Sequence, residues 1–145
     1  MAMNKSDATE MEKETGNQIM LVVGRMPKKN HDAAFLSYKQ ADDLLRKYGV
    51  LRKELFQLNN TETYDDMGLT NIANTVSATQ DEEVWVELQY YRDRKHMEEV
   101  RAKCGNDENM GRLYKQSLDL LTPGSRFIFG EFDRMRESGC HRNSR

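Results

Sequence analysis

The clearest pattern of hydrophobic and polar positions lies at residues 84–91, where side chains alternate between two sets. One set is entirely apolar and consists of Val84, Val86, Leu88 and Tyr90. The other set is half aromatic and half polar and consists of Trp85, Glu87, Gln89 and Tyr91. Because successive side chains of a strand point to opposite faces of a sheet, both faces of this strand need cover.

Three more strands and three helices are predicted by the same kind of pattern. The other strands are expected at residues 19–23, 50–58 and 126–132. Apolar residues recur at helical spacing at about residues 30–48, 93–104 and 106–121. Polar capping residues precede these helices, and Gly49 and Gly105 stand where the first two are expected to end.

The predicted order is strand, helix, strand, an insertion, and then strand, helix, helix, strand. This order predicts a ferredoxin-like α+β sandwich, in which a four-stranded antiparallel sheet carries its helices on one face. The domain is expected to cover residues 17–133, between a disordered tail at 1–16 and a polar, basic tail at 134–145. A second copy of the chain is the simplest cover for the other face of the sheet, so we expect a homodimer.

A polar insertion at about residues 59–82 separates the second and third predicted strands. Segments of this length without structure are uncommon in compact domains. The weak alternation of residues 72–78 indicates a short edge strand, and a single helical turn at about residues 69–73 is the alternative. We expect the insertion to be a lid over a pocket or, by preference, an arm that embraces the partner subunit.

Composition excludes several classes of protein. The 145 residues are 37% hydrophobic and 32% charged, and the net charge of −2 argues against a nucleic-acid-binding surface. No apolar run reaches the length of a membrane span, and the opening lacks the apolar stretch of a signal peptide, so we expect a cytoplasmic protein without a membrane partner. Cys104 and Cys140 form no Cys-x-x-Cys pair and are expected to be reduced thiols.

The chain offers few residues for metal, nucleotide or nucleophilic chemistry. His31, His96 and His141 are far apart and are expected to be exposed to solvent. Neither a glycine-rich phosphate loop nor a nucleophile motif occurs. We therefore expect no metal and no cofactor.

Polar side chains among the aromatic ones are the remaining candidates for a site. We assign them to the sheet face opposite the helices, because the apolar set of the third strand is better suited to pack against helices. The candidate residues of a ligand pocket are Arg52, Glu54, Trp85, Gln89, Tyr91 and Phe129. Glu87 and Glu131 are the candidates for a catalytic carboxylate, which must pair with a cation, contact water or change its pKa.

Two interpretations of these polar residues remain open. In the first, they form a polar network between subunits that fixes the register of the dimer, with Arg52 paired to Glu54 or Glu87. In the second, they form a pocket whose aromatic walls hold a small aromatic or enolisable substrate, and Glu87 or Glu131 removes a proton from it.

Four segments resemble the YbaA-like proteins, an uncharacterised family of bacteria and archaea. They are residues 23–30 (VGRMPKKN), 48–52 (YGVLR), 106–110 (NDENM) and 126–132 (RFIFGEF). Their order and spacing extend the resemblance over residues 19–133. The chain has Tyr91-Arg92 where that family has Trp-Pro, and Gly130-Glu131 where it has Gly-Gly.

The resemblance implies a dimeric α/β barrel, in which the sheets of two subunits pack face to face. Proteins of this class include cofactor-independent monooxygenases, isomerases and haem-degrading proteins, and the fold does not choose among them. We expect a homodimer that binds a small molecule in or beside the barrel. The alternatives are a cofactor-independent monooxygenase or isomerase, and an interaction protein that uses its insertion or basic tail. The sequence leaves open whether the protein is an enzyme.

Overall fold

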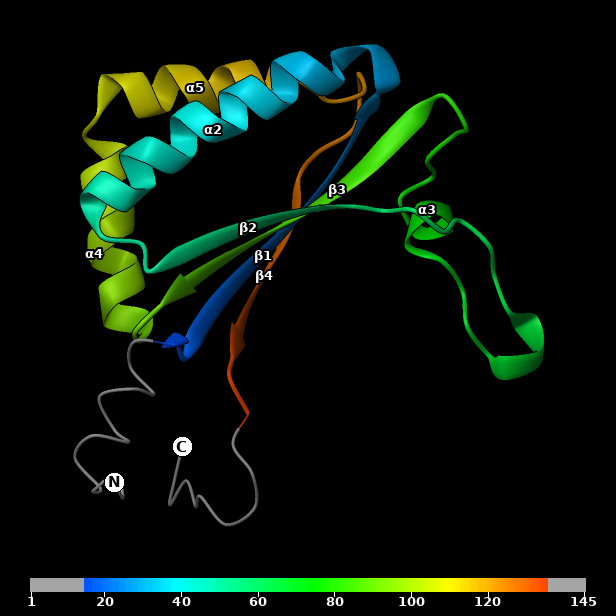
Figure 1. Ribbon diagram of the computed structural model, residues 1–145, viewed down its shortest axis with the longest axis horizontal. Coiled ribbons are helices and arrows are strands. Elements are labelled where there is room, and N and C mark those ends of the chain that lie inside the picture. Colours follow the sequence, from blue (N-terminus) through cyan, green and yellow to red (C-terminus); the bar gives the residue numbers. More distant parts are fainter. Residues whose placement is uncertain (1–14, 136–145) are drawn as a thin grey trace, which may run out of the picture.

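Four antiparallel strands form one sheet in the computed structural model, which describes residues 15–135. The strands are β1 (Gln18–Pro27), β2 (Arg52–Gln57), β3 (Glu82–Tyr91) and β4 (Ile128–Asp133). Their order is β2-β3-β1-β4, with the two longest strands at the centre (Figure 1). The predicted ferredoxin-like α+β fold is confirmed. Most of the two predicted tails, residues 1–14 and 136–145, lies outside the described residues.

Three long helices cover one face and one end of this sheet. They are α2 (His31–Tyr48), α4 (Arg94–Gly105) and α5 (Glu108–Leu120), and a short 3-10 helix, η1 (Lys28–Asn30), precedes α2. α2 and α5 run side by side, and α4 lies at one end of the pair (Figure 1). Within residues 15–135, none of the helices combines the length and the apolar character that a membrane span requires.

Local sequence signals fix the ends of these helices. The Asp93 carboxylate accepts a hydrogen bond from the His96 backbone N–H at 2.8 Å, which caps α4. Asp107 caps α5 in the same way by accepting from the Asn109 N–H at 2.8 Å. Gly49 ends α2 with a φ of 112°, a left-handed conformation that glycine adopts without steric cost. The predicted caps of α4 and α5 and the predicted stop at Gly49 are thus confirmed. The residue before α2 forms no capping side-chain hydrogen bond, and the second predicted stop, Gly105, is the last residue of α4.

The insertion, here called the arm (residues 59–81), extends from the body of the molecule between β2 and β3 (Figure 1). It contains a 3-10 helix, η2 (Asp65–Met67), and one helical turn, α3 (Ile72–Thr75). The predicted edge strand is wrong, and a helical turn forms as in the alternative, but at residues 72–75 and not at 69–73. The physical reason is Asn71, whose side-chain oxygen caps α3 by accepting from the Ala73 N–H at 2.9 Å.

The two faces of the sheet are reversed relative to the prediction. The helices lie over the face that carries Trp85, Glu87, Gln89 and Tyr91. The apolar set of β3 lies on the other side, which we call the open face. Its side chains come from all four strands: Ile19, Leu21, Val23, Phe56, Val84, Val86, Leu88, Tyr90, Ile128 and Phe132.

A space between the helices and the sheet explains why polar side chains lie on this face. The helices line this space with large side chains, such as Tyr38 and Tyr114, and with small ones, such as Ala41 and Ser117. The polar side chains of β3 therefore project into a cavity, where solvent or a ligand can contact them. They do not have to pack against apolar side chains of the helices.

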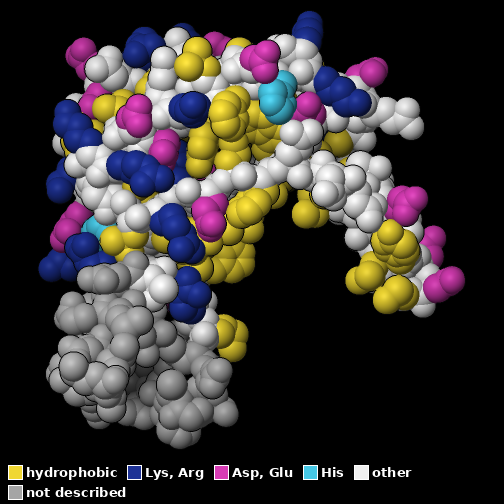
Figure 2. Space-filling model, viewed as in Figure 1, with side chains coloured by type: hydrophobic (Ala, Val, Ile, Leu, Met, Phe, Trp, Pro, Cys, Tyr) yellow, Lys and Arg dark blue, Asp and Glu magenta, His cyan; other side chains and the backbone are white. Residues whose placement is uncertain are grey.

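Much of the open face is accessible in the isolated chain. Phe56 is 48% exposed, and Ile128 and Phe132 are each 51% exposed. The arm covers only one end, where Val76 and Ser77 line a small cavity together with Val23 and Ile128. Figure 2 shows hydrophobic side chains on the concave side of the molecule, between the body and the arm.

Candidate ligand-binding site

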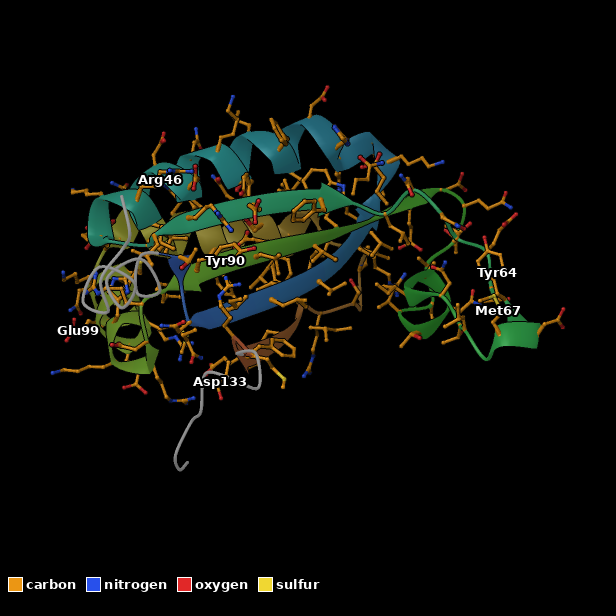
Figure 3. The ribbon with its side chains drawn as sticks, turned by 60° about the horizontal axis from the view of Figure 1, so that its bottom comes forward. Arg46, Tyr64, Met67, Tyr90, Glu99 and Asp133 are labelled. Atoms are coloured by element: carbon orange, nitrogen blue, oxygen red, sulfur yellow. The ribbon has the colours of Figure 1, made fainter. Side chains whose placement is uncertain are left out.

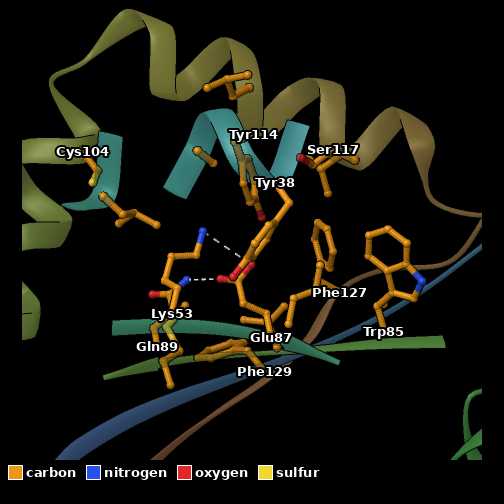
Figure 4. Close-up of a pocket in the computed structure, with 18 of the residues that line it drawn as sticks. Tyr38, Lys53, Trp85, Glu87, Gln89, Cys104, Tyr114, Ser117, Phe127 and Phe129 are labelled. Carbon is orange, nitrogen blue, oxygen red and sulfur yellow. Dashed lines mark hydrogen bonds and ion pairs between the residues drawn. The ribbon is translucent and has the colours of Figure 1, made fainter. Parts of the chain in front are cut away.

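A cavity of about 840 Å³ lies between the sheet and helices α2 and α5 (Figure 4). Its volume is within the range of sites that hold small organic molecules. Most of its lining is apolar, and its aromatic members are Tyr38, Trp85, Tyr91, Tyr114, Phe127 and Phe129. Gly24 of β1 also lies in the lining, where a side chain would meet the Phe127 ring at 2.9 Å. We call this cavity the pocket.

A chain of polar side chains crosses the strand side of the pocket (Figure 4). Tyr91 donates its hydroxyl hydrogen bond to the Gln89 side-chain oxygen at 2.6 Å, and the Gln89 amide donates to Glu87. Lys53 of β2 lies opposite Gln89 in the sheet and forms an ion pair with Glu87, with 3.8 Å between Nζ and Oε1. Strand alternation on β3 and cross-strand pairing with β2 bring these four residues together.

Lys53 is the most deeply placed charge of the pocket. Its side chain is 1% exposed, and its Nζ lies 4.3 Å from the centre of the Tyr38 ring. Burial lowers the pKa of Lys53, and the nearby Glu87 charge opposes that change. Burial also raises the pKa of Tyr38, and the charge of Glu87 raises it further, so the Tyr38 hydroxyl stays protonated at neutral pH.

A second ion-pair cluster lies at the rim of the pocket. Glu131 of β4 contacts Arg94 at 3.1 Å and Arg101 at 3.0 Å, and both arginines belong to α4. The Glu131 side chain is 17% exposed, whereas each arginine is more than half exposed. Glu131 is thus occupied in joining β4 to α4, which makes it less suited than Glu87 to act as a base.

The aromatic wall at the other end of the pocket is held by specific contacts. The Trp85 indole N–H donates to Glu83 at 2.9 Å, and the His31 ring packs edge-on against Trp85 with 5.2 Å between centroids. His31 Nδ1 lies 2.7 Å from the same Glu83 carboxylate, and this hydrogen bond raises the pKa of His31. The Phe35 ring also packs edge-on against Trp85, with 6.5 Å between centroids.

Six of the eight residues predicted for the site line this pocket. They are Trp85, Glu87, Gln89, Tyr91, Phe129 and Glu131. The structure places them beneath the helices and not on the face where they were expected. Whether they contact a ligand stays a prediction.

Arg52 and Glu54 lie elsewhere, on the open face, because they alternate with Lys53 along β2. The Arg52 guanidinium lies 3.7 Å from Glu54 and 4.2 Å from the centre of the Tyr90 ring. Tyr90 donates its hydroxyl hydrogen bond to Glu54 at 2.6 Å. The predicted pairing of Arg52 with Glu54 is confirmed, but grouping these two residues with Trp85 and Glu87 was wrong.

The predicted exposure of His96 is also wrong. His96 is 5% exposed, because it lies on the buried side of the first turn of α4 with its ring edge-on to Tyr91. Its Nδ1 accepts a hydrogen bond from the Arg92 N–H at 3.0 Å, and burial lowers its pKa. Among residues 15–135, no cluster of His, Cys, Asp and Glu side chains is arranged to hold a metal ion.

Sequence reasoning missed Lys53, Tyr38 and Arg101 as pocket residues. Lysine is rarely buried, so the position of Lys53 among the polar residues of β2 does not predict a buried side chain. In the observed register Lys53 pairs with Gln89, which sets a cation diagonally across from Glu87, but the sequence does not fix this register.

Two solved oxygenase structures share the fold. The chain is similar to SnoaB, a cofactor-independent oxygenase from Streptomyces nogalater, with a TM-score of 0.50 and 10% identity over 83% of this chain and 95% of that one. It is also similar to an antibiotic biosynthesis monooxygenase, with a TM-score of 0.51 and 12% identity over 82% and 99% of the two chains. At these identities the likeness concerns the fold alone, which is the ferredoxin-like α+β arrangement described above.

A family model gives a more specific assignment than the fold. A model of the family described as "Protein of unknown function (DUF1428)" matches residues 18–120, which is more than half of the chain. The chain therefore belongs to the DUF1428 family. The match includes every described strand and helix from β1 to α5. A search of curated proteins finds no match.

Proposed function

We propose that the protein is a cytoplasmic homodimer that binds a small, largely apolar organic molecule in the pocket of each subunit. The observation that carries this proposal is the cavity of about 840 Å³ with aromatic walls and a few polar side chains on one side. Such a combination is the usual form of a small-molecule site. The proposed ligand contacts are Trp85, Gln89, Tyr91 and Phe129. We also propose that, within the DUF1428 family, the chain is related to the YbaA-like proteins.

The open face supports the proposed dimer. It carries apolar side chains from four strands, and several of them are about half exposed in the single chain. A contiguous apolar surface of this kind usually marks an interface. Two open faces packed together give the dimeric α/β barrel, and they leave the pocket on the helix side of each sheet. The arm lies beside this interface, where its exposed Met67 can contact the partner subunit.

A catalytic role is the alternative. Cofactor-independent monooxygenation or isomerisation of a small aromatic or enolisable substrate is supported by the fold shared with SnoaB. Glu87 is the first candidate for the base of such a reaction, because Glu131, which also lines the pocket, is paired with two arginines. Binding requires only the pocket, so it is the primary proposal.

Filling the pocket tests the proposal. Ala41 lines the pocket from α2, whereas Ala33 of the same helix is exposed and lies outside it. We expect the neutral probe 2-naphthamide to change the fluorescence of Trp85, the only tryptophan of the chain, and Ala41→Phe to remove this binding while Ala33→Phe preserves it. Equal binding by both variants, or no binding by the natural chain, would reject the pocket as a ligand site for this class of compound.

A further inference from the structure

One cation lies deep among the apolar walls of the pocket. The Lys53 side chain is 1% exposed, whereas the Arg101 side chain, which also lines the pocket, is 52% exposed. A buried ammonium group loses much of its hydration and gains most from a partner that carries negative charge.

The contacts of Lys53 leave part of its hydrogen-bonding capacity unused. Its Nζ lies 3.8 Å from Glu87, which is beyond the usual length of a direct hydrogen bond, and its other close contact is the Tyr38 ring. Within residues 15–135, no side chain or carbonyl oxygen forms a hydrogen bond with this ammonium group, which has three donors. Glu87 is itself shared, because it accepts a hydrogen bond from Gln89.

The charges that line the pocket favour an anion. They comprise three cations, Lys53, Arg101 and Arg126, and two carboxylates, Glu87 and Glu131, which leaves a net charge of +1. Glu131 is further compensated by Arg94, which lies outside the lining. Two further charges outside the lining, Asp42 and Arg46, act on Lys53 with opposite signs. The net positive charge of the lining therefore favours an anionic ligand despite the presence of Glu87.

We propose that the pocket selects an organic anion, whose anionic oxygen binds the Lys53 ammonium while a ring-containing apolar body lies against the aromatic walls. This inference rests on the proposed function, since it needs the pocket to be a ligand site. In this proposal Lys53 recognises the negative charge of the ligand, and Glu87 competes with the ligand for the Lys53 ammonium.

Two probes of one shape test this assignment. 2-Naphthoate and 2-naphthamide share a ring system and differ in one charge, and calorimetry gives the affinity for each. We expect the natural chain to bind the naphthoate more tightly. Lys53→Met should weaken naphthoate binding roughly tenfold to a hundredfold, the value of a charge-assisted hydrogen bond, and should leave naphthamide binding unchanged. Lys103→Met, at an exposed lysine of α4, is the control and should change neither affinity.

Glu87→Gln should change the affinity for 2-naphthoate in the opposite direction to Lys53→Met. It tests the role of Lys53 even if the Lys53 variant does not fold. Removing the competing carboxylate should strengthen naphthoate binding, because the ammonium is then free for the ligand. Weaker naphthoate binding by Glu87→Gln, or equal affinity for the two probes in all variants, overturns the role of Lys53 and leaves the proposed function intact. Failure of the natural chain to bind either probe overturns the proposed function itself.

Discussion

Glu82 is the residue that joins three separate parts of the chain at one end of the sheet. Its carboxylate contacts Arg25 of β1 at 2.6 Å, accepts a hydrogen bond from the Thr79 N–H at 2.7 Å, and accepts another from the Thr122 hydroxyl. Burial alone would raise the pKa of Glu82, but these hydrogen bonds outweigh it and lower the pKa to about 2.

This lowered pKa predicts how stability depends on pH. Because the carboxylate is more acidic in the folded state than its ordinary value of 4.5, its stabilising effect is complete above that pH and is lost as the pH falls toward 2. Glu82→Gln should cost about 2 to 3 kcal/mol in free energy of unfolding at pH 7, and this cost should shrink in acid. Urea unfolding at several pH values measures it.

The control for this measurement is Glu98→Gln. Glu98 pairs with Arg94 on the surface of α4 and its side chain is 58% exposed, so the substitution should have little effect at any pH. A cost of Glu82→Gln that stays constant from pH 7 down to acid would contradict the assigned network.

Single residues also show where prediction from sequence ends. Alternation correctly grouped Trp85, Glu87, Gln89 and Tyr91 on one face, because the two-residue period of a strand is a local property. Which face the helices cover, and the cavity that remains between α2, α5 and the strands, depend on how these elements pack together. That is a property of packing between distant segments, and no local pattern contains it.

Among the elements, the arm has a defined structure although most of its residues are polar. Asn71 holds it together, since its side-chain nitrogen donates to the carbonyl oxygens of Asn60 at 2.7 Å and Glu62 at 2.8 Å. Backbone hydrogen bonds in both directions between Tyr64 and Leu69 close its tip. Tyr64 and Met67 lie at the end farthest from the body (Figure 3).

Asn71→Ala should loosen the arm without unfolding the domain. The substitution removes the cap of α3, worth about 1 kcal/mol, together with both donated hydrogen bonds. Hydrogen exchange should therefore become faster at residues 60–76, while the global unfolding midpoint changes little. Asn74→Ala, within the same short helix, is the control; equal exchange in the two variants would show that Asn71 does not hold the arm.

The elements were largely predictable because their signals are local. Asp93, Asp107 and Gly49 mark helix ends with hydrogen bonds or a backbone conformation that only a few residue types provide. The arm was not, since the weak alternation of residues 72–78 fits a strand as well as a turn. The deciding feature there is the Asn71 cap, which acts over two residues.

On the scale of the whole molecule, the two faces of the sheet have separate roles. The helix side holds the pocket within a single chain, and the open face carries exposed apolar surface, to which we assign the proposed second copy. The apolar character of both strand faces was predictable from strand composition. The arrangement of pocket and interface was not, because it follows from which face the chain's own helices leave uncovered.

The most direct test of this account combines the mass of the protein in solution with binding in the pocket. Leu88 lies on the open face near the centre of β3, and Leu36, which is 58% exposed on α2, provides the matched control. By analytical ultracentrifugation, the natural chain and Leu36→Glu should be dimers, and Leu88→Glu should be a monomer that still binds 2-naphthamide. A natural chain that sediments as a monomer, or a Leu88→Glu monomer that has lost the probe, would contradict the account.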